Sequence, residues 1–207
     1  MPSSPKIPKE LILQNALEFV RKNGYDQLTI KALAAWIGCS TQPISWHFKN
    51  MEGLRSSLAE YMLAYADTKL KVSMEEPLSA FEASGTAYLK MAVEEPNLFR
   101  FLYLNGYQGN CAGNFHMLTQ DAMHREIISA VATHYNIEET DAEEYVRNAM
   151  IYTHGAATLI ATGVISADFP EAVTLVKQAS DAYLQSTIRK AQNTPFRGHH
   201  DGRKNRP

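Results

Sequence analysis

The chain has 207 residues, 45% of them hydrophobic, two cysteines and a net charge of −2 from 20 Lys/Arg against 22 Asp/Glu. This composition argues against a mostly disordered chain and a disulfide-built secreted domain, and it allows a substantial core in one or two domains. Because the N-terminus has no apolar stretch of signal-peptide length and no apolar run reaches about 20 residues, we expect a cytoplasmic protein without membrane contact.

Helical periodicity dominates the N-terminal part. We predict a helix over about 8–23, followed by two short helices between Thr29 and Phe48. Thr29 is expected to cap the first short helix, and Gly38 to end it in the left-handed conformation. Ser40 is expected to cap the second, with Pro43 in its first turn. The pattern therefore predicts helix, tight turn and helix.

The second short helix has two different faces. Ile44 and Phe48 are four residues apart and share the apolar face, whereas the other face is polar and carries Thr41, Gln42, Ser45 and Lys49. Hydroxyl and amide groups can meet base edges in the major groove while a lysine binds a phosphate. The alternative is a solvated helix in any bundle, since helix-turn-helix geometry also occurs without DNA.

Six further helices are expected after residue 50. The first is predicted to start at Asn50 with Glu52 and to run to about Val72, the second to start at Pro77 and Ser79 with Glu82, and the third at Pro96. The fourth is predicted to run from Phe115 to about Tyr135, the fifth to start at Thr140 with Glu143, and the sixth at Asp168 with Glu171. The glycine- and asparagine-rich stretch 105–114 is expected to be a flexible loop. We read nearly the whole chain as helical, with no strand-rich section.

Charge divides the chain into three parts. Residues 1–55 carry +3, residues 56–193 carry −8 and residues 194–207 carry +3. A basic N-terminal part on an acidic body would face a polyanion with its basic end. We therefore predict an N-terminal helix-turn-helix domain at 1–52, a C-terminal helical bundle at 53–193 and a disordered basic tail at 194–207.

The N-terminal residues resemble the TetR/AcrR family of transcriptional regulators. The similarity covers roughly residues 9 to 58 and is carried by Ala16-Leu17, Gly24, Leu28-Thr29-Ile30, Leu33-Ala34, Ile37-Gly38-Cys39-Ser40 and Trp46-His47-Phe48-Lys49-Asn50. The resemblance implies an all-α homodimer whose N-terminal domain reads DNA and whose C-terminal domain dimerises and holds a small-molecule effector. The expected function is a ligand-responsive regulator, most simply a repressor released from a near-palindromic operator by its effector.

By position, the resemblance implies backbone contacts for Thr29 and Lys31, base contacts for Thr41, Gln42 and Pro43, and a phosphate contact for Lys49. Trp46 is expected either to touch base methyls or sugars or to pack in the core. The full predicted DNA-binding set is Thr29, Lys31, Ser40, Thr41, Gln42, Pro43, Ser45, Trp46, His47 and Lys49. One departure is Ser45, where the family often has a tyrosine, so the operator sequence cannot be inferred.

The C-terminal part resembles the family less closely. The stretch from Tyr88 through Glu94-Glu95-Pro96 to Leu102, with His154-Gly155, is similar to one subgroup with a Trp/His-Gly signature. An apolar or amphipathic effector of unknown identity is expected between the helices. The predicted pocket residues are Tyr88, Met91, Phe99, Tyr103, Tyr107, Phe115, Met123, His124, Met150 and His154. For each of them, a place in a filled core is the alternative.

The last two predicted helices are rich in small and apolar residues, which suits a self-complementary four-helix interface between two chains. The predicted interface residues are Ala156, Ile160, Phe169, Val173, Val176 and Tyr183. The alternative is that both helices pack inside one chain.

Two other functions fit the sequence less well. A small helical enzyme would use Cys111 as nucleophile with a histidine as base, but no spacing supports that pair. A protein-interaction module without specific DNA binding is disfavoured by the basic N-terminal part and the polar helix face. No histidines have a metal-ligand spacing backed by a carboxylate. We therefore expect a regulator, not an enzyme, with no metal and no cofactor.

Overall fold

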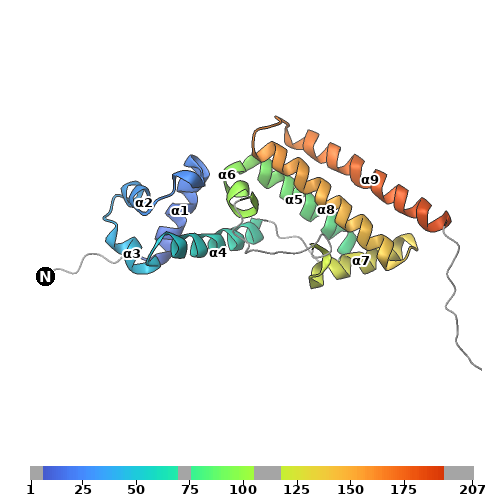
Figure 1. Cartoon of the computed structure of the whole chain (residues 1–207), viewed down its shortest axis with the longest axis horizontal. Helices are drawn as coiled ribbons and strands as arrows, with labels where there is room; N and C mark the ends of the chain where they lie inside the picture. Colours follow the sequence, from blue (N-terminus) through green and yellow to red (C-terminus); the bar gives the residue numbers. More distant parts are fainter. Residues whose placement is uncertain (1–6, 70–75, 105–117, 194–207) are drawn as a thin grey trace, which may run out of the picture.

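The computed structural model describes residues 7–69, 76–104 and 118–193, and these form helices joined by short turns (Figure 1). The elements in chain order are α1 (Lys9–Asn23), η1 (Tyr25–Gln27), α2 (Ile30–Ile37), α3 (Gln42–Phe48), α4 (Met51–Lys69), α5 (Pro77–Glu94), α6 (Pro96–Phe99), η2 (Arg100–Leu104), α7 (Ala122–Tyr135), α8 (Glu139–Ala161) and α9 (Phe169–Asn193). The predicted all-α fold is confirmed. Of the described helices, none has both the length and the apolar character needed to cross a bilayer.

The chain forms two packed parts, which we call the head (residues 7–62) and the body (residues 76–193). Helices α1 to α3 gather at one end of the molecule, and α4 runs from them toward the body (Figure 1). In the body, α8 and α9 lie side by side, and α5 and α7 also pack against α8. The predicted domain boundary between residues 52 and 53 falls in the first turn of α4, whose first half contributes Leu54 and Leu58 to the head core.

Several helix ends follow from the local sequence. Thr29 Oγ1 accepts a hydrogen bond of 3.0 Å from the Ala32 amide and thereby caps α2. Gly38 then ends α2 with φ 79°, a left-handed conformation that glycine adopts without a steric penalty. The carboxylate of Asp168 caps α9 by accepting from the Glu171 amide at 2.8 Å. The Asn50 side chain likewise accepts from the Gly53 amide at 2.9 Å, so these predicted caps are confirmed.

The prediction that Ser40 caps α3 is wrong. The helix begins at Gln42 after Thr41, and no side chain makes a capping hydrogen bond there. A capping oxygen accepts from the second or third amide of a helix, and Pro43 at the second position has no N–H to donate. The proline therefore removes one of the two donors that a cap would use.

Helix α5 starts at Pro77, as predicted, but Ser79 lies in its interior, because a proline at the first position already sets the helical φ. Helices α8 and α7 begin at residues other than those predicted. Thr140 lies inside the first turn of α8 and does not cap it; the carboxylate of Glu143 instead accepts from the Thr119 hydroxyl at 2.7 Å. Helix α7 starts at Ala122, after the capping residue Asp121.

Some predictions fall on residues outside the described part of the chain. These are the end of the fourth helix at Val72, the loop at 105–114, the start of the seventh helix at Phe115 and the tail at 194–207.

Candidate DNA-binding surface and effector site

Helix α3 is held in the head by its apolar face. Ile44 and Phe48 are buried in the head core, whereas Ser45 and Trp46 face solvent, with Trp46 66% exposed. The turn at Gly38 sets α3 across the end of α2. The structure thus presents a short helix with one buried apolar face and one exposed polar face, as the four-residue spacing predicts.

Most of the predicted DNA-binding residues lie on the surface of the head. The exposed members are Thr29, Lys31, Ser40, Thr41, Gln42, Ser45, Trp46 and Lys49, and the half-buried ones are Pro43 and His47. Thr29 uses its oxygen as a helix cap, which leaves its O–H proton available to a phosphate. The 66% exposure of Trp46 disfavours the alternative of core packing.

His47 has a structural contact that the sequence did not indicate. Its Nε2 lies 2.8 Å from the backbone oxygen of Ile7. A carbonyl oxygen only accepts hydrogen bonds, so Nε2 carries a proton and donates. Lys9 also places its ammonium 5.6 Å from the Phe48 ring centroid. Together these contacts hold the start of α1 against α3.

Lys49 occupies an unusual backbone position directly after α3. Its φ is 65°, in the region that favours glycine or asparagine, and its side chain is exposed. Such a conformation costs a residue other than glycine energy. The exposed lysine directly follows the exposed face of α3.

Gly53 fixes the angle between α3 and α4. A Cβ atom at this position would lie 2.2 Å from the backbone oxygen of Phe48, far inside van der Waals contact. Only glycine lets the first turn of α4 approach the end of α3 this closely. Sequence reasoning missed this residue because the close approach depends on the packing of the two helices.

Arg21, at the C-terminal end of α1, joins the head to the body. Its Nε donates to both carboxylate oxygens of Glu95, at 3.0 and 2.8 Å, and its Nη2 donates to the Tyr65 hydroxyl at 3.0 Å. Burial acts to lower the pKa of the guanidinium, but the hydrogen bonds to Glu95 and Glu18 outweigh it and the net pKa is raised. Asn97 adds a bond of 2.9 Å to the Arg21 backbone oxygen.

The α6–η2 segment (residues 96–104) contributes to both cores. Leu98 and Phe101 are buried in the head core, where the ring of Phe101 lies 4.7 Å from that of Tyr25. Phe99 is buried in the body core and Tyr103 packs against both. A movement of this segment would therefore change the packing of both the head core and the body core.

Four of the predicted effector residues form one aromatic cluster between α5, α6, η2 and α8. Ring centroids are 5.0 Å apart for Tyr88 and Phe99, 4.8 Å for Tyr88 and Tyr103, and 5.0 Å for Phe99 and Tyr103. The Tyr88 hydroxyl lies 2.7 Å from His154 Nδ1. Met91 packs against the same core. The rings touch one another, as in the filled-core alternative.

The electrostatics of this cluster are those of a neutral site. Burial raises the pKa of the Tyr88 hydroxyl, with a smaller contribution from Tyr103, and burial lowers the pKa of His154. No Lys, Arg, Asp or Glu contributes to either shift. Among the described residues, no three His, Cys, Asp or Glu side chains gather closely enough to hold a metal ion.

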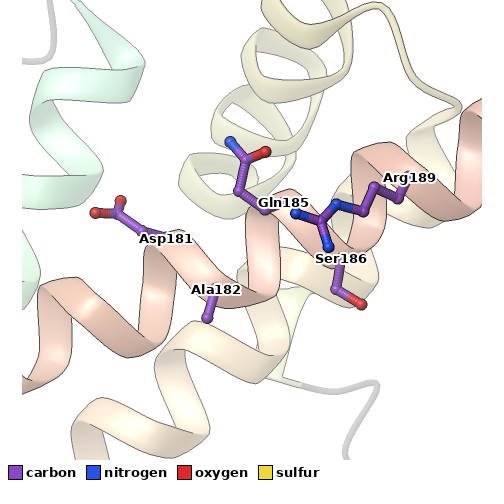
Figure 2. A pocket seen from close by; sticks show the side chains of 5 residues that line it. All are labelled: Asp181, Ala182, Gln185, Ser186 and Arg189. Carbon is purple, nitrogen blue, oxygen red and sulfur yellow. The ribbon is translucent and has the colours of Figure 1, made fainter.

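The other predicted effector residues lie elsewhere. Met150 packs in a separate cluster with α7 and α9, Met123 is exposed, and His124 pairs with Asp121 at the start of α7. Tyr107 and Phe115 are outside the described residues. A shallow hollow of about 440 Å³ on α9, lined by Asp181, Ala182, Gln185, Ser186 and Arg189, contains none of the predicted effector residues (Figure 2).

Five of the six predicted dimer-interface residues pack within the chain. Ala156, Ile160, Phe169, Val173 and Val176 belong to the body core between α8 and α9, whereas Tyr183 is 37% exposed. Small side chains on α8 bring α9 close in the same chain. The apolar residues that α8 and α9 leave exposed are Ile151, Leu159, Leu175 and Tyr183.

The lowered pKa of His154 predicts a pH effect on stability. Above about pH 6.5 the histidine is neutral in both the folded and the unfolded chain and contributes no pH dependence. As the pH falls below that value, the unfolded chain takes up a proton that the folded chain resists, so stability falls until the folded pKa is reached. Chemical denaturation between pH 5 and 7.5 is expected to show a smaller slope for His154→Gln. An unchanged slope would contradict this assignment.

Comparison with known proteins agrees with this geometry. Residues 12–58 match the family described as bacterial regulatory proteins, tetR family. The Tetracycline repressor protein class C of Escherichia coli is 36% identical over 63 residues, which are 30% of this chain and 29% of that protein. The match thus spans less than a third of this curated relative.

Solved structures resemble the chain over most of its length. A protein with unknown function from Rhodococcus sp. RHA1 has a TM-score of 0.64 at 25% identity, covering 90% of this chain and 98% of that one. A TetR variant from Acinetobacter baumannii AYE in complex with minocycline has a TM-score of 0.56 at 16% identity, covering 90% and 99%. At 16% identity, the second structure shows a similarity of fold alone.

These matches define the class of the head. The segment 12–58, which contains α2, the Gly38 turn and α3, is similar to the tetR family of bacterial regulatory proteins. The resemblance to TetR/AcrR regulators predicted from the residues is confirmed. The proteins that the head resembles are regulatory proteins, which agrees with the expectation that the chain is not an enzyme.

Proposed function

We propose that the protein is a DNA-binding transcription regulator that reads its operator with α3. The observation that carries the proposal is the exposed polar face of α3, at Thr41, Gln42 and Ser45, within the segment that matches the tetR family. Hydroxyl and amide groups on this face would contact base edges, while Lys31 and Lys49 would contact phosphates. Pro43 would also approach the bases and Trp46 base methyls or sugars, and the other residues of the predicted DNA-binding set would contact the DNA backbone around them.

The regulator would act as a homodimer. Two heads about 34 to 36 Å apart would read a near-palindromic operator, one half-site each. The exposed apolar residues Ile151 and Leu159 on α8 and Leu175 and Tyr183 on α9 support an interface on this face. A mass in solution of one chain at micromolar protein concentration would argue against the dimer.

A small-molecule effector would release the repressor from DNA. The aromatic cluster of Tyr88, Phe99, Tyr103 and His154 borders the α6–η2 segment that also packs in the head, so a ligand that separates these rings would shift that segment. The solved TetR variant of similar fold is in complex with minocycline, which supports a small-molecule ligand for this protein. The α4 helix would carry the change to the head spacing.

Mobility-shift titration with the DNA upstream of its own gene tests the proposal. We expect sequence-selective retention that weakens as the salt concentration rises, because phosphate contacts release counterions. Equal retention of unrelated DNA of the same length would contradict the proposal that α3 reads a specific operator.

Lys49→Ala tests the phosphate contact at the end of α3. We expect weaker binding to every DNA sequence and a decrease of roughly one in the slope of log affinity against log salt. Lys177→Ala, an exposed lysine on α9, is the matched control and should leave the slope unchanged. If Lys49→Ala altered base preference alone, the residue would be a base contact.

A further inference from the structure

The outer face of α9 has a row of polar side chains spaced by one helical turn. Asp181, Gln185 and Arg189 follow one another at four-residue intervals, and the small side chains of Ala182 and Ser186 lie beside them. Figure 2 shows the acid and the arginine at opposite ends of this row with Gln185 between them. All five residues are exposed and line the hollow of about 440 Å³.

The two charges at the ends of the row have no ion-pair partner within the described chain. Neither Asp181 nor Arg189 makes a salt bridge there, whereas Lys190 on the neighbouring face contacts Glu144 at 2.8 Å and Asp141 at 3.3 Å. The pKa of the Tyr145 hydroxyl is raised mainly by burial, and the carboxylate of Asp181 makes a smaller contribution to that rise. The row is thus free to meet a charged surface from outside.

A row with an acid at one end and a base at the other is complementary to itself when it is reversed. In a two-fold dimer, if residue i contacts residue j, then j contacts i in the other chain. An axis beside Gln185 would place each Asp181 opposite Arg189 of the partner subunit. Each charge lies four residues, about 6 Å, from that axis, a distance at which two crossing helices are still in contact.

We propose that α9 pairs antiparallel with α9 of a second copy about Gln185, with two reciprocal Asp181–Arg189 ion pairs. This proposal rests on the proposed homodimer and specifies its register. Leu175, seven residues before Ala182, lies on the same side of α9 as this contact, whereas Tyr183 lies on another side. A parallel alignment would set like charges against each other, which is unfavourable. Ala182 and Ser186 are small enough to let the two backbones approach, and the two Gln185 amides can each donate and accept a hydrogen bond.

Charge exchange between chains tests the register. Asp181→Lys and Arg189→Glu are each expected to weaken the homodimer at least about tenfold in analytical ultracentrifugation, since both ion pairs become repulsive. An equimolar mixture of the two variants is expected to form heterodimers, because one pair then joins the new lysine to the new glutamate and the other is the unchanged pair of Asp181 with Arg189. The chain that carries both substitutions is expected to regain a homodimer. Arg125→Glu, an exposed position on α7, is the control and should not change the dissociation constant.

Two results would overturn the proposal, and they separate it from the homodimer itself. If the unmodified chain is a dimer and both single variants dimerise equally well, the register is wrong while the dimer stands. If the unmodified chain is a monomer, the register and the homodimer fail together. Rescue in the mixture also shows that both variants are folded, so loss of dimer in the singles cannot come from unfolding.

Discussion

Phe101→Ala is expected to lower the free energy of unfolding by about 3–5 kcal/mol, the usual cost of removing a fully buried phenylalanine. Phe101 has 0% exposure and belongs to the head core, although η2 follows the body helices α5 and α6 in the chain. Its loss should therefore destabilise the head and weaken DNA binding together. Urea denaturation followed by circular dichroism measures the first effect, and mobility shift measures the second.

Two variants control this experiment. Phe101→Leu keeps most of the buried volume and is expected to cost about 1.5 kcal/mol or less. Leu63→Ala on the exposed side of α4 is expected to change stability by no more than about 0.5 kcal/mol. An effect of Phe101→Ala as small as that of Leu63→Ala would show that α6–η2 does not hold the head.

Gly53→Ala is expected to destabilise the head by about 1–3 kcal/mol and to reduce DNA affinity more than that loss of stability explains. The new methyl group would lie 2.2 Å from the Phe48 oxygen, so either α4 must move away from α3 or the last turn of α3 must distort. Both movements displace Lys49 and the exposed face of α3. Thermal melting and DNA titration on the same preparation measure the two effects.

The matched control is Gly85→Ala. Gly85 lies in the interior of α5, and a Cβ there meets nothing within 4 Å. Alanine is the better helix former, so this variant is expected to gain about 0.5–1 kcal/mol. Normal DNA binding by Gly53→Ala would contradict the close approach of α3 and α4.

The sequence predicted the parts of the molecule that local spacing determines. Ile44 and Phe48 are buried because they lie four residues apart on a short helix, and Gly38 ends α2 because its backbone accepts a positive φ. The exposed face of α3 follows from the same spacing. Such features need only the residues of one turn or one helix, which can be read in order along the chain.

Contacts between distant segments could not be predicted in this way. Arg21 and Glu95 are 74 residues apart, and no pattern in either helix indicates the other. The contact of His47 with Ile7 and the approach of Gly53 to Phe48 also depend on how helices pack.

Periodicity also cannot tell whether a helix face meets its own chain or another. The small residues of α8, including Ala156, were predicted to face a second chain. They pack against neighbours in the same body, where a small side chain lets two helices approach equally well.

The most direct test of the account is selection of DNA from fragments of the source genome, followed by footprinting of the selected fragments. We expect a near-palindromic site with two protected half-sites whose centres are about one helical turn, 34 to 36 Å, apart. We also expect Gln42→Ala to change the selected bases while leaving the salt dependence as it is. Recovery of fragments without a shared sequence, or selection unaffected by Gln42→Ala and Lys49→Ala, would contradict the claim that α3 reads DNA.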